Sequence, residues 1–166
     1  MDFVIRAMDK KNTLDREFFD NINFESFKTT VKDADNFSEE ELKDKFEKFE
    51  EDDPLDINDP EHFVFILETY NSIRAGLIWL AIREPFWRFD KQLAWIYNLH
   101  IAPGFRKQGL ARILMIKAEE WAFEQKLDLI VLHVLDDNTF ARSLYESLGY
   151  KLIHTHNESC FYEKVI

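Results

Sequence analysis

The order strand, helix, strand between residues 92 and 135 constrains the fold more than any other feature of the sequence. The segment QLAWIYNLHIAP predicts a strand that ends at Pro103, because proline cannot continue a central strand. Apolar residues then recur with a helical period from Leu110 to Trp121, and the unbroken apolar run LDLIVLHV follows. Such a run is typical of a strand that is buried on both faces. These segments therefore predict a helix-covered sheet that contains a parallel crossover.

The segments around this unit predict further strands and helices. Apolar runs bounded by turn residues predict strands within DFVIRAM, HFVFILETYNSIRAGLIWLAI, YKLIHTH and SCFYEKVI. A short helix is predicted over residues 139–148, with Gly149 as its C-terminal cap. Residues 12–31 predict one or two helices, and Ser38 with Glu41 has the spacing of a capping box at the start of another. The predicted fold class is therefore α/β.

The negative charge is concentrated in one segment. Residues 33–61 hold 14 of the 32 acidic residues and three lysines, a difference equal to the formal net charge of −11. We expect this segment to belong to an acidic helical region at 14–61 within a single domain over residues 1–166, because no repeat or linker divides the sequence. Nucleic-acid binding needs a basic surface, so we expect no nucleic-acid partner.

The cysteine content and the length of the apolar runs indicate where in the cell the protein is expected. Cys160 is the only cysteine, which excludes a disulfide within the chain and favours a reducing environment. The N-terminus has no signal-peptide pattern, and the longest apolar runs are too short to span a bilayer. We therefore expect a cytoplasmic protein with no membrane partner.

The stretch GFRKQGLARILM places Arg106 and Lys107 just before a predicted helix. A helix N-terminus offers unpaired N–H groups and attracts anions, and a nearby arginine can pair with phosphate oxygens. Gly109 lets a backbone approach such an anion without a Cβ in the way. The stretch therefore predicts a phosphate-binding loop, and the alternative is that both cations are solvated loop residues.

The strand, the R-x-x-G-x-A loop, the apolar strand and the segment NTFARSLYESLGY occur in this order. Together they resemble the GNAT superfamily of acetyl-CoA-dependent N-acetyltransferases, most closely the catalytic subunits of protein N-terminal acetyltransferases. The resemblance is specific over residues 92–151, looser from residue 62, and says little about 14–61. It implies a mixed, mostly antiparallel central sheet flanked by helices, with the acidic helical region as an insertion near the N-terminus. It also implies acetyl-CoA as co-substrate, bound by the core at 92–151, and no metal.

The resemblance assigns cofactor contacts to individual positions. It implies that the loop N–H groups bind the CoA pyrophosphate, that the pantetheine arm pairs with the preceding strand, and that the Ile101 N–H stabilises the oxyanion. Ala111 stands where the family motif often has a second glycine. The implied cofactor-binding residues are Leu99, Ile101, Arg106, Lys107, Gln108, Gly109, Leu110, Ala111, Arg112, Asn138 and Tyr145.

Three residues are candidates for the proton transfers. Tyr145 matches a family tyrosine that faces the CoA sulfur and would serve as general acid, although a tyrosine on an amphipathic helix can equally pack on the core. His133 matches a histidine that helps to deprotonate the amine through water in some relatives, and its other interpretation is a structural residue. Trp95 occupies the position of the tyrosine that partners this histidine, so Tyr97 is the substitute candidate.

Three interpretations of the function remain, and two of them differ in the acceptor amine. The sequence favours a peptide N-terminal α-amine, because its pKa of about 8 suits a weak base and the strand at 92–103 carries no glutamate. A polyamine or another small amine is the alternative, attracted by the acidic segment. The third is a non-catalytic acyl-CoA-binding regulatory protein. Four aromatic residues could form an acceptor-side wall or could equally be core residues and loop anchors, so none is assigned to the site: Trp79, Phe86, Trp87 and Phe89. Acyl preference and oligomeric state are not predicted.

Overall fold

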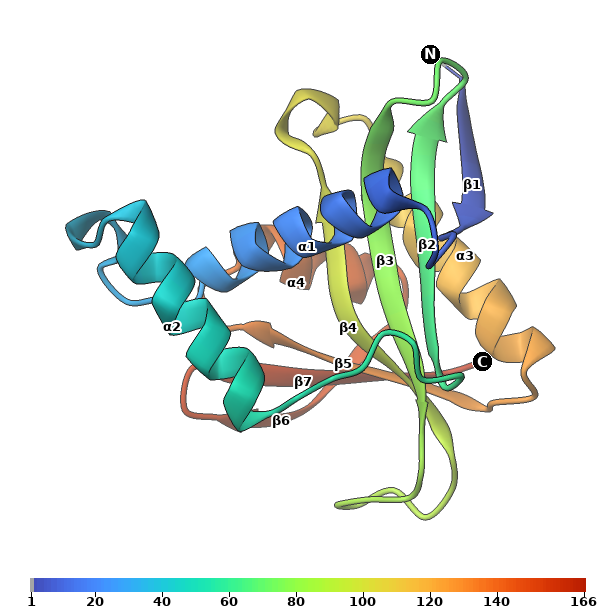
Figure 1. The fold of residues 1–166 in the computed structure, drawn as a ribbon. Helices are drawn as coiled ribbons and strands as arrows, with labels where there is room; N and C mark the ends of the chain where they lie inside the picture. The colour runs from blue at the N-terminus through green and yellow to red at the C-terminus, as the bar shows by residue number, and fades with distance from the viewer. Residues whose placement is uncertain (1) are drawn as a thin grey trace.

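The computed structural model describes residues 2–166 and confirms the predicted fold class (Figure 1). The strands are β1 (Phe3–Ala7), β2 (His62–Thr69), β3 (Arg74–Arg83), β4 (Leu93–Ile101), β5 (Leu129–Leu135), β6 (Lys151–His156) and β7 (Ser159–Val165). The helices are α1 (Thr13–Lys28), α2 (Glu39–Asp52), α3 (Leu110–Glu124) and α4 (Thr139–Ser147), with short 3-10 turns η1 (Ala34–Asn36) and η2 (Pro103–Phe105).

The strands form one sheet in the order β1-β2-β3-β4-β5-β7-β6. Among the strands within residues 2–166, β4 and β5 are the only parallel pair, and α3 makes the crossover between them, as the order of segments predicts. Every other neighbouring pair is antiparallel. The sheet is therefore mixed and mostly antiparallel.

A β-bulge interrupts β4 in the middle of the sheet. Trp79 of β3 pairs with Asn98, whereas the next residue, Leu80, pairs with Ile96, so Tyr97 is an extra residue in β4. Pairing between β4 and β5 is confined to residues 94–96 and 130–132. Beyond Ile96 the two strands no longer share a ladder, because a bulge bends and twists its strand.

Helices cover both faces of the sheet (Figure 1). The main core lies on the face covered by α3 and α4, where the fully buried Leu114 and Met115 pack against strand residues such as Leu80 and Ile130. On the opposite face, Phe19 and Ile22 of α1 pack with Trp79 and Val64 of the sheet. In β5, Ile130, Leu132 and Val134 belong to the main core, whereas Val131 on the other face packs with Leu93 and Trp95 of β4 rather than with a helix.

Residues 12–31, for which the sequence predicts one or two helices, contain the single helix α1, and the acidic helix α2 follows it. The predicted capping box at the start of α2 is present, since the Ser38 side chain accepts from the Glu41 N–H and the Glu41 carboxylate accepts from the Ser38 N–H. Phe46 holds α2 against α1, with ring centroids 5.5 Å from Phe24 and 5.2 Å from Phe27. Among residues 2–166, none of the helices combines the length and apolar character needed to cross a lipid bilayer.

Candidate active site

A cavity of about 620 Å³ opens where β4 and β5 diverge. Its walls are the second half of β4 from Ile96 to Ile101, the end of β5 from Leu132 to Leu135, the loop before α3, and the inner side of α4. The C-terminal turn of α1, including Ser26, closes one side. The bulge therefore creates this cavity by ending the β4–β5 ladder early.

The loop before α3 has the geometry of an anion-binding turn. Lys107 and Gly109 adopt left-handed conformations, with φ of 62° and 76°, and α3 begins at Leu110. Within residues 2–166, the backbone N–H groups of residues 107–111 have no hydrogen-bond acceptor. A Cβ built on Gly109 would meet nothing within 4 Å, so the positive φ, rather than crowding within the chain, explains glycine here. The loop thus presents unpaired donors to the cavity.

Both arginines among the predicted cofactor-binding residues also have partners in the protein. The Arg106 Nε donates to the Ile101 carbonyl oxygen at 2.8 Å, which ties the loop to the end of β4. An Arg112 Nη donates to the Ser147 Oγ at 2.6 Å, which joins α3 to α4. Both side chains line the cavity, together with Lys107 and Ala111, whereas Gln108 is exposed beside it. Arg106 therefore braces the loop and Arg112 braces α3 against α4, and each has further N–H groups available for an anion.

The backbone of β4 presents its free edge to the cavity. The Ala102 N–H donates to the Ala75 carbonyl of the neighbouring strand at 2.8 Å. Backbone groups alternate in direction along a strand, so those of Leu99 and Ile101 point away from β3 and into the gap beside β5. This is the orientation that an extended cosubstrate needs in order to pair with β4.

Tyr145 lines the cavity from α4 and is buried, with its ring 6.1 Å from that of Tyr150 and 6.2 Å from that of Tyr162. Its hydroxyl has no hydrogen-bond partner within residues 2–166. Burial raises the pKa of Tyr145 to about 12. The phenol is therefore protonated at neutral pH and available as a hydrogen-bond donor.

His133 and Tyr97 both line the cavity but make different contacts. The His133 ring lies 6.1 Å from that of Trp95 and 5.8 Å from that of Phe161. Solvent reaches it through the cavity, yet the surrounding protein atoms remove enough water to lower its pKa below the usual value. The Tyr97 ring stacks on His62 at 5.5 Å, and burial raises the Tyr97 pKa. Among residues 2–166 no hydrogen bond joins Tyr97 to His133, and the Trp95 ring contacts both.

Asn138 has a structural role that the motif did not reveal. It is the N-cap of α4, and its Oδ1 accepts from the Ala141 N–H at 3.1 Å. This bond explains the asparagine at position 138, since an N-cap side chain accepts from the backbone N–H of the second or third helical residue. The Asn138 side chain also lines the cavity, so its Nδ2 remains available there.

A polar cluster between α1 and β4 was missed by the sequence analysis. The Asn98 Nδ2 donates to the Asn23 Oδ1 at 2.9 Å, and the Ser26 Oγ donates to the Asn98 Oδ1 at 3.2 Å. His100 lies beside Ser26, and its pKa is lowered by burial and by the Arg106 charge. The bulge turns Asn98 and His100 toward α1, and no pattern in the sequence marks that bulge.

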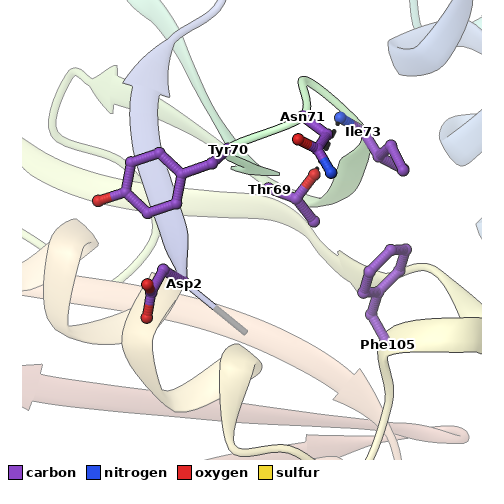
Figure 2. Close-up of a pocket in the computed structure, with 6 residues that line it drawn as sticks. All are labelled: Asp2, Thr69, Tyr70, Asn71, Ile73 and Phe105. Carbon is purple, nitrogen blue, oxygen red and sulfur yellow. Dashed lines mark hydrogen bonds between the residues drawn. The ribbon is translucent and has the colours of Figure 1, made fainter.

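A second hollow of about 170 Å³ lies at the β2–β3 turn (Figure 2). Figure 2 shows Tyr70 and Phe105 at opposite ends of it, with Thr69 between them. The Thr69 Oγ1 already accepts from the Ile73 N–H at 3.2 Å, so this polar group serves the turn itself. No group of three or more His, Cys, Asp or Glu side chains within residues 2–166 could hold a metal ion. The larger cavity is therefore the candidate active site.

Comparisons with known proteins agree with this arrangement. The model of the acetyltransferase (GNAT) family matches residues 23–150. A Pyrococcus furiosus protein, provisionally named an acetyl transferase, is 27% identical with a TM-score of 0.77, over 95% of this chain and 98% of that one. Arabidopsis thaliana NAA60, solved with acetyl-CoA, is 15% identical with a TM-score of 0.70, over 99% of both chains. A variant of the spermidine N-acetyltransferase SpeG from Vibrio cholerae is 22% identical with a TM-score of 0.67, over 98% of this chain and 93% of that one.

The gap beside β4 and the unpaired donors at the start of α3 fit an extended, phosphate-bearing cosubstrate such as acetyl-CoA. The family model extends from within α1 to the residue before β6 and so includes both features. The resemblance to the GNAT superfamily is thereby confirmed. The chain belongs to the acetyltransferase (GNAT) family and is an acetyl-CoA-dependent N-acetyltransferase.

Proposed function

We propose that the protein transfers the acetyl group to the N-terminal α-amine of a peptide or protein by direct attack of the amine. One observation carries this proposal: no aspartate or glutamate is among the residues that line the cavity. The bases that line it are His100 and His133, and burial lowers the pKa of each. The site therefore suits an amine that gives up its proton easily.

The proton balance separates the candidate acceptors. An α-ammonium has a pKa of about 8, whereas a lysine ammonium has a pKa of about 10.4. Transfer of the lysine proton to the same imidazole costs roughly 3 kcal/mol more, at 1.36 kcal/mol per unit. Without a carboxylate in the cavity, nothing in its lining offsets this difference.

Three groups of this chain would then act on the reacting atoms. When bound, acetyl-CoA supplies an activated thioester. His133, through water, accepts the proton of the amine, and the Ile101 N–H stabilises the negative charge that develops on the carbonyl oxygen. The Tyr145 hydroxyl donates a hydrogen bond to the departing sulfur. The loop at 107–111 holds the phosphates, with Arg106 and Lys107 adding positive charge.

Acetylation of a polyamine is the second candidate, and the charge of α1 and α2 favours it. Burial raises the pKa values of Asp20 and Glu50, and the Asp20 and Glu47 charges raise that of Glu50 further. These carboxylates form a negative surface outside the cavity, which would attract a polycation over long range. SpeG shows that a spermidine acetyltransferase has this fold.

Turnover of acetyl-CoA on matched acceptors tests the proposal. We expect a peptide with a free N-terminus and no lysine to react faster than spermidine or an N-terminally blocked peptide that contains one lysine. His133→Ala should lower the peptide rate by roughly 100-fold, most strongly below about pH 8, where fewer amines are neutral. His156→Ala is the matched control, because His156 is exposed and does not line the cavity. Preference for spermidine, with a steep dependence on salt, would establish the polyamine alternative.

A further inference from the structure

Aromatic side chains continue the cavity wall from His133 across β7 to the loop between β3 and β4. Phe161 of β7 follows His133, with ring centroids 5.8 Å apart, and Trp87 of the loop follows Phe161 at 5.5 Å. Trp87 also lies 5.3 Å from His154 of β6. With Trp95, 6.1 Å from His133, these residues form a surface that we call the aromatic wall. It begins at the proposed base and leads away from the cofactor loop.

Trp87 is held in this wall by an unusual backbone conformation. Its φ is 53°, in the left-handed region that a bulky side chain rarely adopts. The loop is tied to β6 where an Arg88 Nη donates to the Ile153 carbonyl oxygen at 3.4 Å. Packing does not bury the ring, which is 54% exposed. A strained residue with a half-exposed aromatic ring beside a candidate active site is the pattern found at ligand clamps.

The charges around the wall favour an apolar occupant. No carboxylate within residues 2–166 makes a salt bridge with His133 or His154. The Arg83 guanidinium stacks on Phe86 at 3.8 Å and on Trp95 at 5.0 Å, which places a fixed positive charge at one end of the wall. A polycation would be repelled by Arg83 and by the Arg88 guanidinium, which lies 5.8 Å from the centroid of the Trp87 ring. A neutral apolar or aromatic group would cover the rings without losing ionic hydration.

We propose that Trp87 is a specificity-determining residue: the aromatic wall binds the side chain next to the reacting amine and favours acceptors in which that side chain is large and apolar. The inference rests on the proposed function, because it takes the reacting amine to lie at His133. From there the wall is the continuous surface along which an extended acceptor would lie. Phe161 packs against Trp87, and the exposed part of the Trp87 ring contacts the acceptor.

Two peptides that differ only in a first residue of phenylalanine or serine test this inference in steady-state turnover. The wild type should give a kcat/KM roughly 10-fold higher for the phenylalanine peptide, the order expected for one aromatic contact. Trp87→Asn, which tolerates the left-handed backbone, should remove most of this preference and leave the serine peptide within about twofold. Trp87→Phe should restore it.

Two further variants and an affinity measurement check that a changed peptide preference does not result from loss of folding. Phe161→Leu keeps most of the volume and should reduce the preference in the same direction, and Phe123→Asn, an exposed aromatic on α3, should not change it. Unchanged acetyl-CoA affinity shows that each variant is folded. If Trp87→Asn lowers kcat/KM equally for both peptides, or if the wild type does not distinguish them, Trp87 does not determine specificity. A wild type that acetylates spermidine and no peptide overturns the proposed function itself, before any variant is measured.

Discussion

A substitution series at Gly109 separates the two physical reasons for glycine at the start of α3. The residue has a φ of 76°, and a Cβ there would meet no atom of the chain within 4 Å. Gly109→Ala therefore creates no clash within the protein and adds only backbone strain. Gly109→Asn adds less strain, because asparagine visits the left-handed region more readily. Gly109→Asp has nearly the same shape as Gly109→Asn and adds one negative charge.

The two effects differ in size. A left-handed alanine costs roughly 1–2 kcal/mol, which corresponds to about 5- to 30-fold in acetyl-CoA affinity if the loop relaxes in the free protein. A carboxylate about 6 Å from a phosphate charge costs roughly 3 kcal/mol at an effective dielectric constant of about 20. The aspartate variant should thus bind at least about 100-fold more weakly than the asparagine variant.

Calorimetric titration with acetyl-CoA measures this difference, with thermal unfolding as the check that all three variants are folded. The gap between Gly109→Asp and Gly109→Asn should narrow as salt rises, because ions screen an exposed charge pair. Equal affinity of these two folded variants at low salt would refute the assignment of the loop to the pyrophosphate. Unchanged affinity of Gly109→Ala would refute the role of the left-handed backbone.

Three other sites give independent predictions. Tyr145→Phe should slow single-turnover acetyl transfer by about 100-fold without changing acetyl-CoA affinity, since it removes one hydrogen-bond donor, and an unchanged rate would leave Tyr145 as packing. Gly76→Ala should lower the free energy of unfolding in urea by roughly 1–3 kcal/mol, because the new Cβ would lie 2.7 Å from both the His100 carbonyl oxygen and the Ile101 Cδ1. Gly104→Ala is the control and should have little effect, because a Cβ there meets open space. Asp15 is 1% exposed and pairs with Arg6 and Arg74 at 2.7 Å, and the Arg6 hydrogen bond, as the largest cause, holds its pKa well below the usual value. The contribution of Asp15 to the free energy of unfolding is complete above the pKa of about 4 in the unfolded chain, and it is lost as pH falls further. Acid should therefore lower the free energy of unfolding of the wild type more steeply than that of Asp15→Asn. Parallel curves of unfolding free energy against pH would contradict this.

Local pattern predicted the elements that build the cofactor half of the site. The helical period from Leu110 to Trp121 and the apolar run of β5 define the crossover by themselves. The capping box at Ser38 is equally local, because both of its hydrogen bonds lie within four residues. Such features need no knowledge of the rest of the fold.

The acceptor half depends on contacts that local pattern does not contain. Tyr97 reads as an ordinary strand residue, and its place in a bulge is decided by pairing with β3. The bond from Asn98 to Asn23 joins residues 75 positions apart. The predicted partnership of Tyr97 with His133 depends on the same long-range geometry, and the structure places Trp95 in contact with both instead.

The bulge at Tyr97 also divides β4 into two halves in which the side chains alternate between the two faces of the sheet with a shift of one residue. Before it, Leu93 and Trp95 face the aromatic wall and Ala94 and Ile96 face the main core. After it, Leu99 and Ile101 face the main core, and Asn98 and His100 face α1. Deletion of Tyr97 would make Ile96 and Asn98 consecutive residues opposite Leu80 and Trp79, so the ladder would become regular while Leu99 and Ile101 still faced the core. What the extra residue adds to β4 is therefore the bend that separates this strand from β5, and its loss would close the gap for the cosubstrate rather than disturb the core.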